Sequence, residues 1–288
     1  MFRSILVPVD GTPESATALP LARVLARTSD GDLHLLTVTP PDSPNAQAAA
    51  SVYLQTTAAL VCDAGVSVHT ANRVGEPAGV IVAYATAHDV DLIVMATRAI
   101  GPRSIMALTS VAHEVVARSP CPVMVTRRGE KQPKRVRTLL APIDGSPGGS
   151  LALAAAQALA LSARGRVVLL DVVVPVPTEA FAALPGMSVG GYIDPTWEDL
   201  AHSAAHAYVD GVVSRLQACG VDAEARVATG DIATEILRCA AEIDADAIVM
   251  STHKVAAPAR AYVPSVADHV IREGVCPVLL VKREPPLE

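Results

Sequence analysis

Aromatic residues are scarce in this sequence. They make up 3% of its 288 residues, so a hydrophobic core must be built from Ala, Val, Leu and Ile. Long hydrophobic runs are missing as well. No stretch approaches the roughly 20 apolar residues that cross a bilayer, and Pro8 and Asp10 interrupt the first apolar run before it could serve as a signal peptide. These absences predict a cytoplasmic chain with no membrane partner.

An excess of positive charge is also lacking. The formal net charge is −6, so the chain has no overall basic field to attract nucleic acid. The basic run at residues 127–137 is the exception, and it can be interpreted as a nucleic-acid contact or as a solvated linker. Without aromatics or a following amphipathic helix it favours the linker, which we place at 129–136. The five cysteines include no closely spaced pair, and this favours core thiols.

The most informative feature that is present is an internal repeat. The string Leu6-Val-Pro-Val-Asp-Gly-Thr-Pro matches Leu140-Ala-Pro-Ile-Asp-Gly-Ser-Pro, at an offset of 134. Met95 and Met250 are offset by 155. The difference of 21 residues is an insertion in the second unit, within residues 174–200. We therefore expect a first domain at 1–128 and a second at 137–288.

The insertion holds a local concentration of large side chains, namely Met187, Tyr192 and Trp197. Two interpretations stay open for it. It is either a flap packed on its own domain, or a lid or interface patch over the ligand end of the sheet.

Each unit alternates apolar strands with helices. In the first unit the strands are expected at residues 3–9, 33–38, 66–73, 92–95 and 123–125. The helices are expected at 13–28, where Gly31 closes the helix, and at 46–63, 77–88 and 109–118. Strands that are apolar on both faces are typical of parallel sheets covered by helices. The pattern predicts an α/β fold with two doubly wound, Rossmann-like five-stranded parallel sheets.

The order and spacing of these motifs, present twice, resemble the universal stress protein family over nearly the whole chain. The motifs include Ile5-Leu-Val-Pro-Val-Asp-Gly-Thr, Ser110-Val-Ala and Pro120-Cys-Pro-Val-Met-Val. The resemblance implies a tandem protein of the adenine nucleotide alpha hydrolase-like type with strand order 3-2-1-4-5. It also implies that the last strands of two units pair antiparallel. This pairing permits either a monomer with an internal pseudo-dimer or a homodimer.

ATP-binding members of this family carry a glycine loop after the fourth strand. Glycines let backbone N–H groups approach the phosphates at a helix N-terminus. Here the glycine positions hold Ala96, Ala99 and Thr109 in the first unit, and Ser251, Lys254 and Pro264 in the second. The first loop gains only small side chains, whereas Pro264 removes an N–H and Lys254 is long. The first unit is therefore the better candidate for ATP, with Mg.

The resemblance implies the following site residues. In the first unit they are Pro8, Val9, Asp10, Val38, Met95, Ala96, Ala99, Thr109, Ser110 and Val111. In the second they are Asp144, Val172, Met250, Ser251, Lys254, Ser265 and Val266. For the two aspartates a second interpretation stays open, because an Asp-Gly-Thr-Pro turn also connects a strand to a helix without any ligand.

The sequence offers little for catalysis or metal binding. His202 and His206 have helical metal-ligand spacing but no evident third ligand, so a solvated helix face is favoured. No nucleophile is paired with a base, and we expect no catalytic and no metal residue. The leading hypothesis is a non-enzymatic stress-response binding or regulatory module with degenerate nucleotide loops and an unidentified protein partner. The alternative is an ATP- or AMP-binding switch that uses mainly the first domain, with slow hydrolysis left open.

Overall fold

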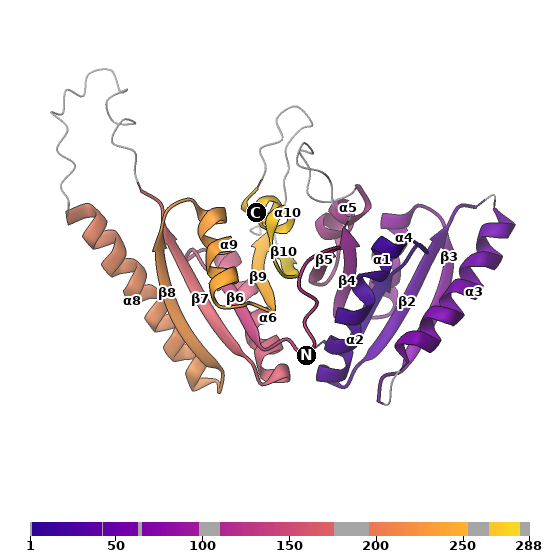
Figure 1. The fold of residues 1–288 in the computed structure, drawn as a ribbon, viewed down its shortest axis with the longest axis horizontal. Coiled ribbons are helices and arrows are strands. Elements are labelled where there is room, and N and C mark those ends of the chain that lie inside the picture. Colours follow the sequence, from indigo (N-terminus) through magenta and orange to yellow (C-terminus); the bar gives the residue numbers. More distant parts are fainter. Residues whose placement is uncertain are drawn as a thin grey trace, which may run out of the picture.

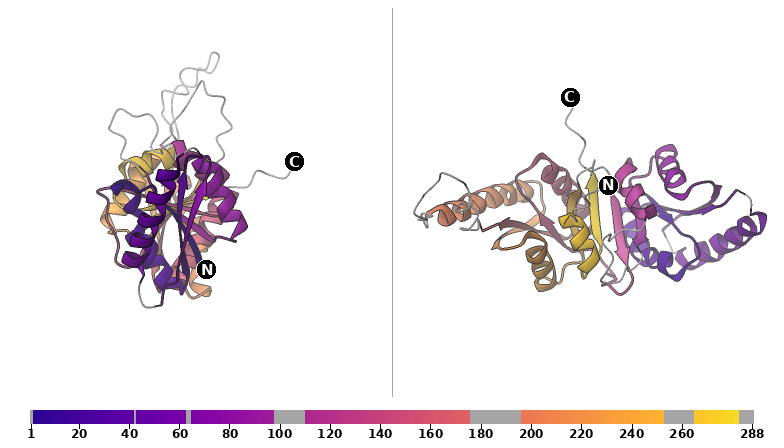
Figure 2. Two further views of the ribbon diagram at one scale, coloured as in Figure 1. Left: turned by 90° about the vertical axis from the view of Figure 1, so that its right-hand side faces the viewer. Right: turned by 90° about the horizontal axis from the view of Figure 1, so that it is seen from above.

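The computed structural model describes residues 2–41, 43–62, 65–97, 110–175, 196–252 and 265–282. These residues form one ten-stranded sheet with helices on both faces (Figures 1 and 2). No helix among them is long and apolar enough to span a membrane.

The first half contains five strands and the helices between them. The strands are β1 (Ser4–Pro8), β2 (Asp32–Thr39), β3 (Val68–Val74), β4 (Leu92–Thr97) and β5 (Val123–Arg127). The helices are α1 (Pro13–Ala16), α2 (Ala18–Ser29), α3 (Pro44–Val61), α4 (Pro77–Ala87) and α5 (Ser110–Arg118).

The second half repeats this plan. Its strands are β6 (Thr138–Pro142), β7 (Arg166–Val173), β8 (Asp222–Thr229), β9 (Ala247–Thr252) and β10 (Val278–Lys282). Its helices are α6 (Pro147–Ala163), α8 (Thr196–Ala218), α9 (Ile232–Glu242) and α10 (Val266–Glu273). The predicted insertion overlaps the start of α8, and residues 176–195 lie outside the described residues.

The strand order is β3-β2-β1-β4-β5-β10-β9-β6-β7-β8. The strands of each half are parallel in the order 3-2-1-4-5, so the predicted fold class is confirmed. β5 and β10 pair antiparallel, with Val125 opposite Val278 and Val123 opposite Leu280. The pairing implied by the family resemblance therefore occurs within this one chain, at the centre of the sheet (Figure 2).

Two hydrophobic layers lie on the two faces of the sheet. Ile5 and Val7 point into one layer with α2, while Leu6 points into the other with Ile81 of α4. Both layers continue across β5 and β10 into the second half. Cys239 and Cys276 belong to this core, but Cys62 and Cys219 are exposed, so the expectation that all the thiols are buried is wrong.

The first helix departs from the expected single segment at residues 13–28. It is broken at Thr17 into α1 and α2, because Pro20 has no N–H to donate to the Ala16 carbonyl and its ring crowds that carbonyl. Asp30, not Gly31, takes the left-handed conformation that ends α2. Gly31 is required for a different reason, since a Cβ there would collide with the backbone of Arg3. Gly165 lies against Arg137 in the same way.

The basic segment between the halves is only partly solvated. Arg127 donates to the carbonyls of Arg272 and Gly274 at the end of α10. The Nζ of Lys131 lies 2.8 Å from Asp244 Oδ1 and 3.0 Å from Asp246 Oδ1. Pro133 and Val136 are buried. Gln132, Lys134 and Arg135 are exposed, as in a solvated linker, while the contacts of Arg127 and Lys131 tie β5 to the second half.

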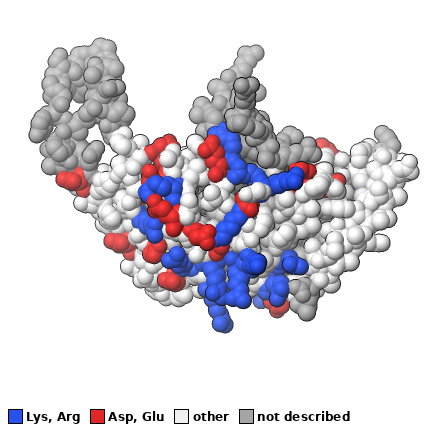
Figure 3. Space-filling view, in the orientation of Figure 1, with Lys and Arg blue, Asp and Glu red and all other residues white. Residues whose placement is uncertain are grey.

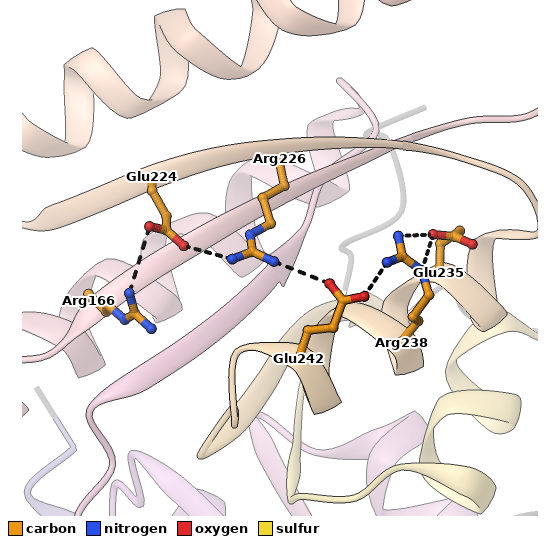
Figure 4. Close-up of polar contacts among 6 residues, drawn as sticks. All are labelled: Arg166, Glu224, Arg226, Glu235, Arg238 and Glu242. Atoms are coloured by element: carbon orange, nitrogen blue, oxygen red, sulfur yellow. Dashed lines mark hydrogen bonds and ion pairs between the residues drawn. The ribbon is translucent and has the colours of Figure 1, made fainter.

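Equivalent outer faces of the two halves carry different chemistry. In the second half, an ion-pair ladder joins Arg166, Glu224, Arg226, Glu242, Arg238 and Glu235 across β7, β8 and α9 (Figure 4). In the first half, the same region holds a histidine cluster, defined as His34, His69 and His88 with Tyr84. The His34 ring centroid lies 5.0 Å from that of His69 and 5.9 Å from that of His88. On the face shown in Figure 3, charged side chains gather over the second half and the centre.

We expect Gly31→Ala to lower the free energy of unfolding by about 1–3 kcal/mol, because the new methyl overpacks the backbone of Arg3. Gly211→Ala is the control. No atom lies within 4 Å of its added Cβ, and alanine favours the interior of α8. Urea unfolding curves of both variants test this, and equal stability of Gly31→Ala and the parent would contradict it.

Burial raises the pKa of the Glu130 carboxyl to about 7 from its ordinary 4.5. The folded state therefore prefers the protonated acid. The resulting stabilisation is complete below pH 4.5 and is lost as the pH rises through about 7. We expect Glu130→Gln to remove this loss. Relative to the parent, the free energy of unfolding of the variant should be about 1–3 kcal/mol more favourable at pH 8 than at pH 4.5. Urea unfolding at both pH values measures it, with exposed Asp199→Asn as control. Parallel pH profiles for Glu130→Gln and the parent would rule it out.

The histidine cluster predicts the opposite trend. Burial lowers the pKa of His34, and the neighbouring His69 and His88 lower it further. The unfolded chain therefore binds a proton more tightly than the folded one, and stability falls as the pH drops through about 6.5. His34→Val, which places the equivalent residue Val168 of the second half at this position, should flatten that acid limb. Unfolding curves at pH 7.5, 6.5 and 5.5 provide the test, with exposed His206→Gln as control. An acid limb unchanged by His34→Val would disprove the assignment.

Candidate ligand-binding sites

Each half contains a pocket at the carboxyl ends of its parallel strands, where ligands bind in open α/β sheets. The first pocket has a volume of about 290 Å³ and the second about 240 Å³. Both are formed by the turn after the first strand of the unit, the ends of its second and fourth strands, and the helix that precedes its last strand.

The first pocket collects most of the residues proposed for that site. Pro8, Val9, Asp10, Val38, Met95, Ala96 and Val111 all line it. Ser110 begins α5, while Ala99 and Thr109 lie outside the described residues. Sequence reasoning missed Thr12, Glu14, Ser15, Leu36, Pro77 and Ile81. Thr12, Glu14 and Ser15 lie at the predicted start of the first helix, so the sequence could have indicated them. No local pattern indicates that Pro77 and Ile81 of α4 line the pocket.

Asp10 has a clear structural role in its turn. Its Oδ1 accepts hydrogen bonds from the Thr12 backbone N–H at 3.0 Å and from the Thr12 hydroxyl at 2.6 Å. Thr12 in turn caps α1 by accepting from the Ser15 N–H. Asp144 accepts from the Ser146 N–H at 2.9 Å in the same manner. These hydrogen bonds give both aspartates a role in their turns. Both also line a pocket, so the turn holds each carboxylate there.

The second pocket likewise brings together Asp144, Val172, Met250, Ser251, Ser265 and Val266, and Lys254 lies outside the described residues. Residues that sequence reasoning missed here are Pro142, Ile143, Gly149, Leu170, Asp171, Ile232, Ile236, Thr252 and Ala267. Asp171 stands out because it adds a second carboxylate. Burial raises the pKa of Asp171, and the nearby negative charge of Asp144 raises it further.

At the helix start beside the second pocket, the protein's own side chains bind two backbone N–H groups. Ser265 Oγ accepts from the Asp268 N–H at 3.1 Å, and Asp268 Oδ2 accepts from the Ser265 N–H at 3.1 Å and from its hydroxyl at 2.9 Å. This capping box satisfies N–H donors that a helix N-terminus otherwise offers to a ligand. The position equivalent to Asp268 in the first half holds His113.

The histidines on α8 show a local contact only. His202 Nε2 lies 2.8 Å from the Thr229 hydroxyl. Among the described residues, no group of three or more His, Cys, Asp or Glu side chains is placed to hold a metal ion. The side chains of Met187, Tyr192 and Trp197 lie outside the description, so both interpretations of the insertion remain predictions.

The architecture defines a tandem, doubly wound α/β protein with a pocket in each half. The sequence model of the universal stress protein family matches residues 1–127 and 135–282. The chain therefore belongs to this family, with two family units in tandem.

Relatives match one unit or both. Universal stress protein Sll1654 of Synechocystis is 32% identical over 137 residues, which are 43% of this chain and 85% of that protein. YxiE of Bacillus subtilis is 29% identical over 148 residues, which are 44% of this chain and all of that protein. A universal stress protein structure from Archaeoglobus fulgidus covers 98% of this chain and 97% of its own, with a TM-score of 0.75 and 19% identity. That structure supports the two-unit fold.

Proposed function

We propose that this chain is a non-enzymatic, cytoplasmic stress-response module that acts by binding, and that its first pocket takes an adenine nucleotide, ATP with Mg. The observation that carries this proposal is the convergence in one cavity of Asp10, Val38, Met95, Ala96 and Val111, which come from four separate segments. A binding role agrees with the stress-response family to which the chain belongs.

The chemistry of the first pocket suits a nucleoside with attached phosphates. Leu36, Val38 and Ile81 offer apolar walls for a base. Asp10 and Glu14 provide carboxylate oxygens of the kind that hold ribose hydroxyls or a magnesium ion. Ala96 is small enough for a close approach to the backbone, and α5 directs its N-terminus to the same cavity through Val111.

Two further features support a binding role over catalysis. The described lining of the first pocket carries carboxylates and hydroxyls but no histidine, cysteine or lysine that could pair with a nucleophile. The antiparallel pairing also joins the β5 edge of the first half to the β10 edge of the second within the chain, and it leaves β3 and β8 as the outer strands of the sheet. We therefore propose that the protein is a monomer whose nucleotide state changes its affinity for a protein partner.

Leucine at equivalent positions of the two pockets tests the nucleotide proposal. Ala96→Leu fills the first pocket and Ser251→Leu fills the second. We expect Ala96→Leu to weaken binding of Mg-ATP at least about tenfold, which is about 1.4 kcal/mol, because the side chain occupies the ligand volume. Ser251→Leu should leave this affinity unchanged. Isothermal titration calorimetry, with thermal melts as a folding control, measures both.

The same titrations can overturn the proposal. No heat at millimolar ATP in the parent protein would show that the first pocket does not bind the nucleotide. Loss of binding only in Ser251→Leu would move the site to the second half. An ATPase rate that Ala96→Leu abolishes would replace the non-enzymatic role with hydrolysis.

A further inference from the structure

We propose that Arg128, in the turn that follows β5, binds the phosphate groups of the ligand in the first pocket and gives up its ion pair with Glu14 to do so. The inference rests on the proposed function, because it takes the ligand of that pocket to be a nucleotide. It deepens that function by assigning a phosphate contact to the segment that joins the two halves.

The described lining of the first pocket is short of positive charge. The carboxylates of Asp10 and Glu14 line it, and no lysine or arginine does. A nucleotide brings further negative charge to these carboxylates, and like charges at close range repel one another. A cationic side chain next to the lining would offset that repulsion.

Arg128 is placed to supply this positive charge. Its Nη1 lies 3.3 Å from Oε1 of Glu14, so the guanidinium directly contacts a residue that lines the pocket. The Arg128 side chain is 69% exposed and that of Glu14 is 35% exposed. Ion pairs with this exposure contribute little to stability, so a ligand can break the pair at low cost. A guanidinium binds phosphate as readily as carboxylate, and it can therefore pass from one to the other.

The backbone next to Arg128 is held in place beside the pocket. In the pairing of β4 with β5, Thr126 lies opposite Ala96, which lines the pocket. Arg127 ends β5 and donates to two carbonyls at the end of α10. Arg128 therefore extends from a fixed position at the carboxyl end of β5, on the same edge of the first half as the pocket.

The second half does not repeat this pair. The residue equivalent to Glu14 is Gly148, at the same offset of 134 that relates Asp10 to Asp144. Glycine has no carboxylate with which to hold an arginine at the pocket. The residue equivalent to Arg128 is Arg283, which lies outside the described residues. The pair of Glu14 with Arg128 thus belongs to the half for which the nucleotide is proposed.

Arg128→Gln tests the inference on the full chain. We expect it to weaken binding of Mg-ATP about tenfold and to leave binding of adenosine unchanged, because adenosine has no phosphate. Arg128→Lys, which keeps the charge but loses the planar guanidinium, should recover part of the loss. Arg135→Gln is the matched control, since Arg135 is an exposed arginine of the same segment, and it should change neither affinity. Isothermal titration calorimetry measures these affinities, and thermal melts confirm that each variant folds.

Glu14→Gln tests the exchange of partners from the other side. Titrations with ATP in the absence of magnesium isolate the ion pair from any metal held by Glu14. The substitution removes a negative charge and releases the guanidinium, so ATP should bind at least about threefold more tightly. Most of this gain should disappear when Arg128→Gln is added. A gain of the same size with and without Arg128→Gln would refute the exchange.

The outcomes separate this inference from the proposed function. If the parent binds Mg-ATP and Arg128→Gln binds it equally well, the role of Arg128 is refuted and the nucleotide site stands. Equal losses for Mg-ATP and adenosine would show that Arg128 shapes the pocket instead of binding phosphate. An equal loss of Mg-ATP binding in Arg135→Gln would show a general effect of charge and would also refute the contact. A parent that binds no ATP would overturn both proposals.

Discussion

The antiparallel pairing of β5 with β10 is the contact on which the rest of the molecule depends. It joins two five-stranded sheets into one, and it lets both hydrophobic layers continue from one half to the other. The segment that follows β5 reinforces it, because Arg127 and Lys131 bind backbone and carboxylate groups of the second half. The two pockets are thus fixed on one continuous scaffold, each at the strand ends of its own half.

On this shared scaffold the two halves have diverged in charge. In the second half, the outer face carries interlocking Arg and Glu side chains on β7, β8 and α9. In the first half, the equivalent face carries histidines and a tyrosine at β2, β3 and α4. The linings of the two pockets differ as well, since Asp171 lines the second pocket and its counterpart Thr37 is not among the described residues that line the first. Backbone geometry was retained while titratable groups changed, which is expected where packing constrains the core and the surface is free to vary.

Much of the fold could be predicted from the sequence, because the inner strands such as β1, β4 and β5 are buried apolar runs and the repeat shows such runs twice. The pockets followed from this, since Asp10, Met95 and Val111 lie at fixed places relative to the predicted strands. Other features depend on tertiary contacts with no local signal. The burial of Glu130, the packing of Gly31 against Arg3 and the position of Asp171 at a pocket wall all need the assembled sheet. Pro20 did signal the break near Thr17, but the helical periodicity around it masked that signal.

Because β5 pairs with β10 inside a single chain, the two halves need not be identical and do not dissociate on dilution. Two copies of one unit would present two identical sites and would separate as their concentration fell. A covalent tandem holds its two halves together at any concentration, because their effective concentration is set by the short segment between them. It also frees each site from the requirement to match the other. The two pockets of one chain can therefore carry different side chains, which the pockets of two identical copies cannot.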